Sequence, residues 1–325
     1  MTYSKTRRAV LAAAAGLSAL SLAGLTSIGP AQAQYPEKGL TLIVPYGAGG
    51  GTDITARLLA KDLEAVMGKP VTVQNIAGGG GWTGWGTLAA AKPDGYTIGY
   101  LNVPAIYAGY LDPKLGRKET LDSFTPIINH VIDYNVLTVK ADSRFKTLKD
   151  LVDEAKSKPN TVSISAHGVG GDEHLAILAF EALTGAKFRI VQNKSTPESK
   201  TQVLGGHVQI LASNVSEIAT EVKAGDLRVL GVMSAEPSRF LPGAPTFKAQ
   251  GYNIEASNSR GIATPAGLPK DIEAKLVAAL EKVILSKEHQ QKAETLFLEP
   301  RVIRAADYKT FLKDNEQSIK KLMSW

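Results

Sequence analysis

The stretch LTLIVPYGAGGGTDITARLLAKDLEAV, residues 40–66, indicates the fold class. Residues 40–45 have the apolar composition of a buried strand, and a glycine-rich turn follows at once. A helical pattern then begins at Thr52 and places apolar side chains on one face, at Ile54, Leu58, Leu59, Leu63 and Val66. A strand that turns directly into a helix is the repeating unit of α/β proteins.

The same alternation continues along the chain. We expect further strands at 71–75, 97–102, 135–139, 162–165, 188–191, 208–212, 227–233 and 261–264. Helices are expected after the capping boxes Thr147-x-x-Asp150 and Ser195-x-x-Glu198, over residues 172–183, and over nearly all of 269–325. We therefore predict parallel sheets covered by helices on both faces, divided into two α/β domains.

The predicted domain division places residues 34–136 and 255–325 in a discontinuous domain 1, and residues 137–254 in domain 2. A long strand near residues 128–139 would carry the chain across. The crossings would be short, which favours a hinge over a flexible tether.

Composition excludes several classes of site. The 325 residues contain no cysteine, so disulfides, thiolate metal sites, cysteine nucleophiles and a lipid-modified cysteine are excluded. The formal charge is +6, of which Lys5, Arg7 and Arg8 supply three; the rest has 37 − 3 = 34 basic and 31 acidic residues, or +3. A chain of this charge without a basic run is not expected to bind nucleic acid.

Residues 1–33 have the order of a secretory signal: a basic start, an apolar alanine-rich stretch, and the small-residue site Ala31-Gln32-Ala33. An uncleaved membrane anchor is the alternative. The letters TRRAVL at 6–11 also resemble a twin-arginine signal, which leaves the export route open. We predict a chain cleaved near Ala33 and released, soluble, into the periplasm.

The glycine-rich turn at residues 46–53 is a candidate anion site. Glycines allow backbone N–H groups to approach a ligand, and the helix start adds unpaired donors and a partial positive charge. The P-loop lysine is absent, and the final glycine of the dinucleotide fingerprint is replaced by Thr52. Neutral donors with little positive charge fit a small carboxylate. A purely structural tight turn is the alternative.

Similar turns follow the strands at 162–165 and 188–191, over residues 165–172 and 193–196. Turns from two domains can face each other across a cleft at the carboxyl ends of the strands. Lys194 could supply a full positive charge or face solvent. The glycine-rich segment 78–86 is the most flexible stretch in this prediction, and its Trp82 and Trp85 would line a pocket or pack under a loop.

Parts of an enzyme are missing from the sequence. The five histidines show no metal-ligand spacing, and the G-x-S-x-G nucleophile elbow is absent. Asp53 is an isolated acid, and His174 suits a capping role better than that of a base. We expect no catalytic residues, no metal and no cofactor.

Motifs in order along the chain add a family resemblance. They are IVPYGAGGGTDITAR at 43–57, KPDGYT at 92–97, DSFTP at 122–126, GVGGDEHLA at 168–176, LGGHV at 204–208, SRFLPGAPTF at 238–247 and TPAGLP at 264–269. Together they resemble the solute receptors of tripartite tricarboxylate transporters, the Bug family. The resemblance implies a type 2 periplasmic-binding-protein fold, with two α/β domains, a hinge and a cleft that closes on a small carboxylate.

The resemblance also assigns ligand contacts, mostly through backbone N–H groups. The residues concerned are Tyr46, Gly47, Ala48, Gly49, Gly50, Thr52 and Asp53 in the first turn, Ala166, His167, Gly168 and Gly171 in the second, and Ser195 and Thr196 in the third. Ala166 stands where serine is usual in the family, which leaves the identity of the carboxylate open. The implied partners are integral membrane permease subunits, and we expect a monomer.

Two alternatives remain at this point. A receptor that presents its ligand to a membrane sensor kinase would use the same cleft. An exported hydrolase or lyase would require turnover that depends on Asp53.

Overall fold

The computed structural model describes residues 35–323, of which residues 38–323 lie in one compact unit. The predicted signal peptide and its cleavage site lie outside the described residues. No helix of the described part of the chain is both long and apolar enough to cross a membrane.

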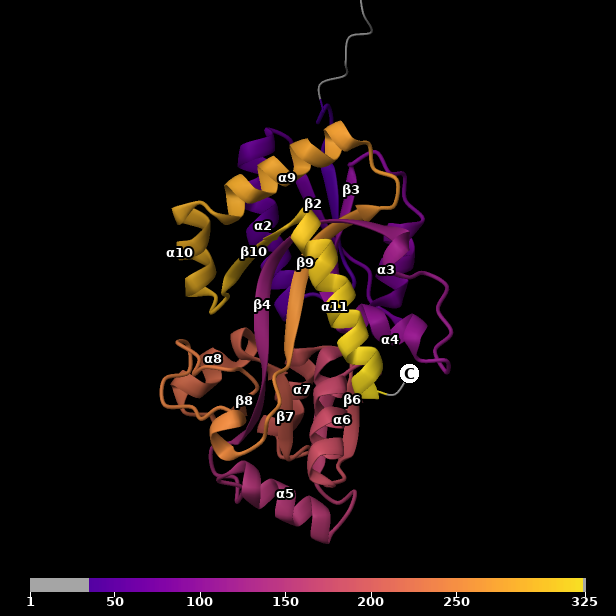
Figure 1. The fold of residues 1–325 in the computed structure, drawn as a ribbon. Coiled ribbons are helices and arrows are strands. Elements are labelled where there is room, and N and C mark those ends of the chain that lie inside the picture. Colours follow the sequence, from indigo (N-terminus) through magenta and orange to yellow (C-terminus); the bar gives the residue numbers. More distant parts are fainter. Residues whose placement is uncertain (1–34, 324–325) are drawn as a thin grey trace, which may run out of the picture. The chain divides into compact units, whose positions relative to one another are not determined.

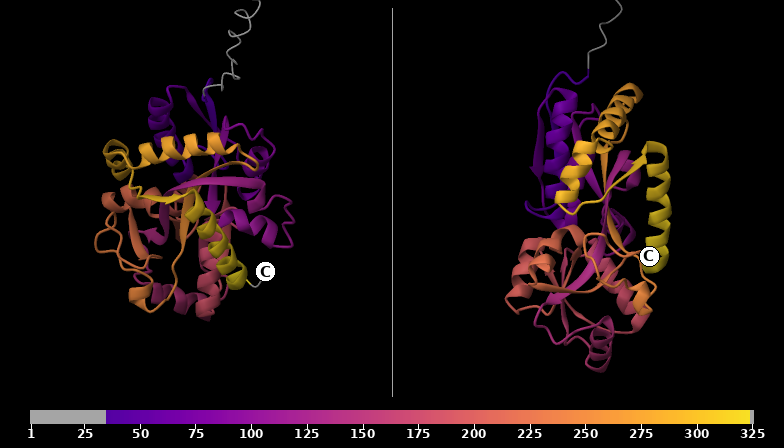
Figure 2. Two further views of the ribbon diagram at one scale, coloured as in Figure 1. Left: turned by 45° about the horizontal axis from the view of Figure 1, so that its top comes forward. Right: turned by 90° about the vertical axis from the view of Figure 1, so that its left-hand side faces the viewer.

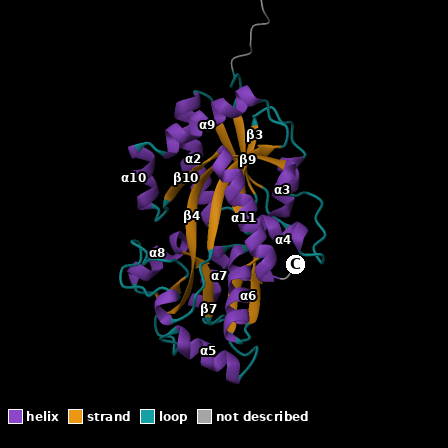
Figure 3. Ribbon diagram, in the orientation of Figure 1, coloured by secondary structure: helices purple, strands orange, loops and turns teal. Residues whose placement is uncertain are grey.

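Strands and helices alternate as the sequence predicts (Figures 1 and 3). The strands are β1 (Leu40–Val44), β2 (Val71–Asn75), β3 (Thr97–Val103), β4 (Phe124–Lys140), β5 (Ser163–His167), β6 (Arg189–Asn193), β7 (Ile210–Asn214), β8 (Leu227–Val232), β9 (Ser257–Pro265) and β10 (Pro300–Arg304). The helices are α2 (Gly51–Met67), α3 (Trp82–Ala89), α4 (Ala105–Leu111), α5 (Leu148–Ser157), α6 (Asp172–Thr184), α7 (Thr196–Leu204), α8 (Val215–Ala224), α9 (Lys270–Ile284), α10 (Lys287–Thr295) and α11 (Ala305–Met323).

Strand β4 joins two parts of one continuous sheet, with the order β2-β1-β3-β9-β4-β7-β5-β6. We call these parts the first sheet and the second sheet. The first sheet contains β2, β1, β3, β9, β10 and the N-terminal part of β4, which pairs with β9 as far as Tyr134. The second sheet contains β5, β6, β7, β8 and the rest of β4, which pairs with β7 from Asn135. The change of partner between adjacent residues makes β4 the element that links the two.

The expectation of purely parallel sheets is wrong. Strand β1 pairs parallel with β2 and β3, and β5 pairs parallel with β6 and β7, but β4 and β9 pair antiparallel with every partner. Strand β10 was also missed, because its five residues lie inside a predominantly helical region. The α/β fold class is unaffected.

Helices cover both faces of each sheet. Beside the first sheet, α2 packs against α9 and α10, and α11 packs against α4 on the opposite side (Figure 2). In the second sheet, α5 and α6 enclose one apolar core around Phe180, and α7 and α8 enclose another around Ile218. The capping box of Thr147 and Asp150 forms as predicted. Ser195 caps α7 by position only, since Glu198 accepts from the Lys194 N–H instead.

Trp82 and Trp85 resolve the alternative left open for the glycine-rich segment. Both are buried in α3, where they pack edge to face with ring centroids 5.3 Å apart and join the core of the first sheet. The segment is therefore a helix from residue 82 rather than a flexible loop. Gly84 permits this packing, because a Cβ there would lie 2.7 Å from the Cα of Pro45.

Candidate functional site

Four helix starts meet at one cavity of about 40 Å³, called the front cavity here. The first sheet and α2 contribute Tyr46, Gly47, Gly50, Gly51, Thr52, Asn258 and Arg260. The second sheet and its helices contribute His167, Gly171, Asp172, Glu173, Lys194, Ser195, Thr196, Asn214 and Glu217. A volume of this size admits a few water-sized groups. The two sides are therefore closed onto each other.

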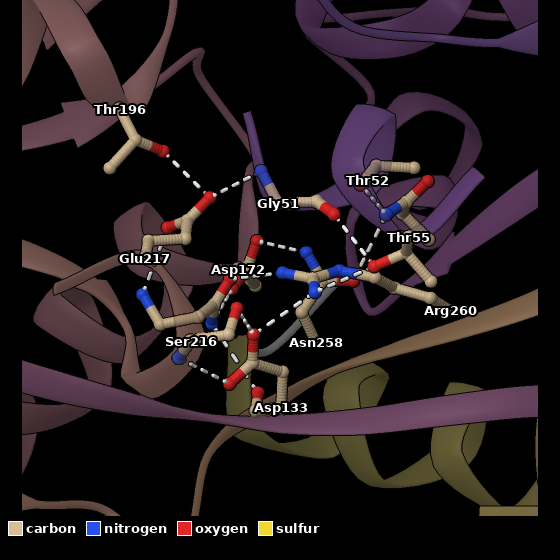
Figure 4. Close-up of polar contacts among 12 residues, drawn as sticks. Gly51, Thr52, Thr55, Asp133, Asp172, Thr196, Ser216, Glu217, Asn258 and Arg260 are labelled. Atoms are coloured by element: carbon tan, nitrogen blue, oxygen red, sulfur yellow. Dashed lines mark hydrogen bonds and ion pairs between the residues drawn. The ribbon is translucent and has the colours of Figure 1, made fainter. Parts of the chain in front are cut away.

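The carboxylate of Glu217 occupies the donors of these helix starts (Figure 4). Its Oε1 accepts from the Gly51 N–H at 2.9 Å and from the Thr196 hydroxyl at 2.7 Å, and its Oε2 accepts from the Asn214 N–H at 3.1 Å. Burial would raise the pKa of Glu217, but the nearby charges of His167 and Arg260 and these hydrogen bonds hold it below its ordinary value. A side chain of the protein itself thus takes the place expected for an anion.

Arg260 lies beneath the first turn of α2 and is 1% exposed. Its guanidinium pairs with Asp133 at 3.0 Å and donates to Asn214 Oδ1 at 3.0 Å. Gly51 is required there, because a Cβ would lie 2.5 Å from the Arg260 Nη2 atom. A buried guanidinium needs such partners, since removal from water is costly for an uncompensated charge.

Asp172, the first residue of α6, is enclosed by three side-chain amides. They come from Asn135, Asn214 and Asn258, with donor–acceptor distances between 2.9 and 3.0 Å. Burial, together with the charge of the adjacent Glu173, raises the pKa of Asp172 to about 8. This carboxyl group links three separate strands, β4, β7 and β9.

His167 is the last residue of β5, and its Nδ1 forms a hydrogen bond of 2.8 Å with Oε1 of Glu173. Burial alone would lower the pKa of His167, but the carboxylates of Glu173 and Glu217 raise it to about 9. The ring is therefore an imidazolium at neutral pH, which makes Nδ1 a donor to Glu173. Its Nε2 is buried and has no hydrogen-bond partner among residues 35–323, and the residue lines the cavity.

The charge of the site differs from the sequence expectation. Neutral donors with little positive charge were expected, whereas Arg260, His167 and Lys194 line the cavity together with Asp172, Glu173 and Glu217. The expectation is wrong chiefly because Arg260 and Glu217 come from segments outside the predicted turns, which carry no local signal of proximity. Donors and acceptors largely satisfy each other in this closed arrangement.

The structure gathers part of the predicted contact set at the cavity. Lining positions are held by Tyr46, Gly47, Gly50, Thr52, His167, Gly171, Ser195 and Thr196. Lys194 also lines it, although it is exposed overall. The remaining five predicted contacts, Ala48, Gly49, Asp53, Ala166 and Gly168, lie outside this lining.

Those five residues have other surroundings. Asp53 accepts from the Gly49 N–H at 2.9 Å and pairs with Arg57, so it fixes the first turn from within. Ala166 is fully buried in the core of the second sheet. Gly168 has a positive φ of 65°, and a Cβ there would lie 3.1 Å from the Cα of Gly80, so it is a point of close backbone approach.

Sequence reasoning missed most of the charged network: Asp133, Asp172, Glu173, Asn214, Glu217, Asn258 and Arg260. A signal existed for three of them. Arg260 directly precedes a predicted strand, and Asn214 with Glu217 has the spacing of a capping box, which forms in α8. Their convergence was not predictable, since 166 residues separate Gly51 from Glu217.

One group among the described residues has atoms close enough to share a metal ion: His167, Glu173 and Glu217, within 4.8 Å of one another. The oxygens of Glu217 already accept three hydrogen bonds, and His167 Nδ1 is held by Glu173. We therefore assign no ion to this group.

Comparisons with known proteins find relatives of this chain. The family profile described as tripartite tricarboxylate transporter family receptor matches residues 55–324. Protein BugT of Bordetella pertussis (strain Tohama I) is 30% identical over 257 residues, which cover 78% of each chain. The solved periplasmic binding protein BugD has a TM-score of 0.83 at 26% identity, with 89% of this chain and 98% of BugD covered.

A third relative shares the fold. MatC from Rhodopseudomonas palustris, solved with bound malate, has a TM-score of 0.81 at 20% identity, with 89% of this chain and 99% of MatC covered. The predicted fold class is confirmed: the chain has the α/β fold of periplasmic binding proteins.

Proposed function

Because the chain belongs to the tripartite tricarboxylate transporter receptor family, we propose that it captures a small carboxylate by hinge closure and delivers it to membrane permease subunits of such a transporter. The family consists of periplasmic solute-binding receptors, so the expectation of a binding protein rather than an enzyme is confirmed. Cleavage near Ala33, release into the periplasm and action as a monomer are parts of the proposal.

One observation carries the proposal: three donors from three helix starts converge on a single carboxylate, that of Glu217. These oxygens stand in for those of a solute. A carboxylate buried among backbone N–H groups and a hydroxyl is stable only if its oxygens find donors, and this set supplies them. The same donors would hold a solute carboxylate once Glu217 swings aside.

A second carboxylate has a place opposite the first. His167 Nε2 has no partner within the described part of the chain, and Lys194 lines the cavity beside the start of α7. These two donors suit a second anionic group. The malate held by MatC makes a short dicarboxylate the first solute to test.

Solute entry requires the front cavity to open, because about 40 Å³ cannot hold a dicarboxylate. We place the hinge where β4 changes partners, at Tyr134 and Asn135, and where the chain returns before β9. The domains would then be residues 34–136 with 255–325, and residues 137–254. Solute contacts to both domains would favour the closed form.

Isothermal titration of the mature chain with malate, adipate and citrate tests the proposal, with succinamide as the uncharged control. We expect saturable binding of at least one carboxylate and none of the diamide. Failure of every carboxylate, combined with binding of a neutral or purely cationic solute, would contradict it.

A further inference from the structure

A second, larger cavity of about 620 Å³ is lined by residues of α6 and α11. We call it the back cavity. Its lining comes from α6, from the linking segments at 132–135 and 253–257, from β10 and from α11. Figure 2 shows α11 and α2 on opposite sides of the sheet. The volume is within the range of sites that enclose small molecules.

Most of this lining is apolar. Ala176, Ala179 and Ala182 of α6 leave space that larger side chains would fill, and Phe311 and Ile319 face them from α11. Leu183 at the rim is 53% exposed. An apolar wall of this extent favours a ligand with a hydrocarbon or aromatic body.

Two acceptors in the lining of the back cavity have no hydrogen-bond partner among the described residues. Asn135 is 2% exposed, and its Nδ2 donates to Asp172 at 2.9 Å, which fixes the orientation of the amide. Within the described part of the chain its buried Oδ1 has no donor, and the Oδ1 of Asn315 on the opposite wall has none either. The carboxyl groups of Asp172 and Glu255 lie in the same lining, against one exposed guanidinium, that of Arg301.

Unpaired acceptors beside carboxyl groups are satisfied by N–H donors, above all by charged ones. We propose that the back cavity binds a small amphipathic amine. The apolar body lies between α6 and α11, and the ammonium group donates to the Asn135 Oδ1 beside Asp172. Burial of the body supplies the affinity, and the orphaned carbonyl oxygen supplies the preference for an amine over an acid.

A mechanical consequence follows, and it rests on the proposed hinge closure. Asp172 lines both cavities, so they adjoin each other. We infer that they lie on opposite sides of the hinge, because α2 borders the front cavity, α11 borders the back cavity, and these helices lie on opposite sides of the sheet. Opening one side by rotation about β4 narrows the other. An amine between α6 and α11 therefore holds the front cavity closed, and it strengthens the binding of a solute that favours the same form.

Hexylammonium is the probe, titrated by calorimetry and thermal shift without any carboxylate solute. We expect saturable binding and a rise in melting temperature. Hexanoate should bind at least about tenfold more weakly. Ala179→Trp fills the back cavity and should abolish the binding of hexylammonium. If that variant does not fold, Ala182→Trp at the exposed rim takes its place in the test. Ala224→Trp on the exposed end of α8 is the matched control and should bind as the unaltered chain does.

The proposal is overturned if hexylammonium does not bind, if hexanoate binds equally well, or if binding survives in a folded cavity-filling variant. Malate is titrated separately in the presence and absence of the probe. If none of the tested carboxylates binds while hexylammonium does, only the proposed function is contradicted. Unchanged malate affinity in the amine-saturated chain would contradict the coupling between the two cavities.

Discussion

Replacing Glu217 by alanine should strengthen the binding of carboxylate solutes. In the structure, this side chain accepts hydrogen bonds from the Gly51 and Asn214 N–H groups and from the Thr196 hydroxyl. A solute carboxylate must displace it before it can use the same donors. Glu217→Ala removes the competitor and one negative charge from the cleft.

The magnitude follows from the bonds that Glu217 gives up. A hydrogen bond to a charged group contributes about 1.5–3 kcal/mol net. Water forms new hydrogen bonds with the displaced Glu217 carboxylate and offsets part of the loss. We therefore take the net cost of displacing Glu217 as one of its three hydrogen bonds. At about 1.4 kcal/mol for each factor of ten, the dissociation constant for malate should fall about 10- to 150-fold.

Titration calorimetry measures this change. Glu221→Ala is the matched control: Glu221 lies one turn further along α8, accepts from Lys200 at 2.6 Å and lies outside the front cavity. Its variant should leave the malate affinity unchanged, and succinamide should gain nothing from either variant. Equal affinities in the two variants, or weaker malate binding in Glu217→Ala, would refute the idea that Glu217 stands in for the solute.

Three further predictions concern stability. Arg260→Met leaves the buried carboxylate partner of the guanidinium uncompensated and should lower the free energy of unfolding by about 3–5 kcal/mol, measured by urea denaturation. The pKa of His167 is raised to about 9 and that of Asp172 to about 8, so the folded state holds both protons more tightly than the unfolded state does. The stabilisation from His167 is complete below its unfolded pKa near 6.5 and is lost as the pH rises to about 9; the cost of ionising Asp172 grows over pH 4 to 8. The urea concentration at the midpoint of unfolding should therefore decrease as the pH rises from 6.5 to 9. Gly109→Ala would place a Cβ 1.9 Å from the indole of Trp82 and should cost about 1–3 kcal/mol by the same urea measurement.

Each of these has a control. The double variant Arg260→Met with Asp133→Asn should recover part of the stability lost in Arg260→Met. If the losses of the two single variants add up in the double variant, the ion pair does not contribute as proposed. Asp172→Asn should flatten the pH profile, and a profile as steep as that of the unaltered chain would exclude the assigned group. Gly47→Ala meets nothing within 4 Å and should change stability by less than about 0.5 kcal/mol.

The sequence predicts the local architecture well, because local architecture depends on neighbours in the chain. Strand β1, the glycine turn and α2 follow from residues 40–66 alone, and β2 at 71–75 has the predicted bounds. The α6 helix ends at Gly185 in the left-handed conformation that its sequence favours. Such features rest on hydrogen-bonding patterns over a few residues.

Interactions between distant segments could not be predicted from the sequence. Strand β10 forms because β4 offers an edge for residues 300–304, and α3 forms because Trp82 and Trp85 gain a core to enter. Neither partner is visible in the local pattern. Tertiary contacts therefore reversed the local expectation in both places.

The chemistry of the cleft divides in the same way. The residue order alone placed glycine-rich helix starts at the ends of strands, and with them a set of backbone donors suited to an anion. Only the tertiary structure brought Glu217, Arg260 and Asp172 to those donors and filled the cavity with the protein's own carboxylate. Backbone donors are fixed by local conformation, whereas the pairing of buried charges depends on which distant side chains folding brings within a few ångströms.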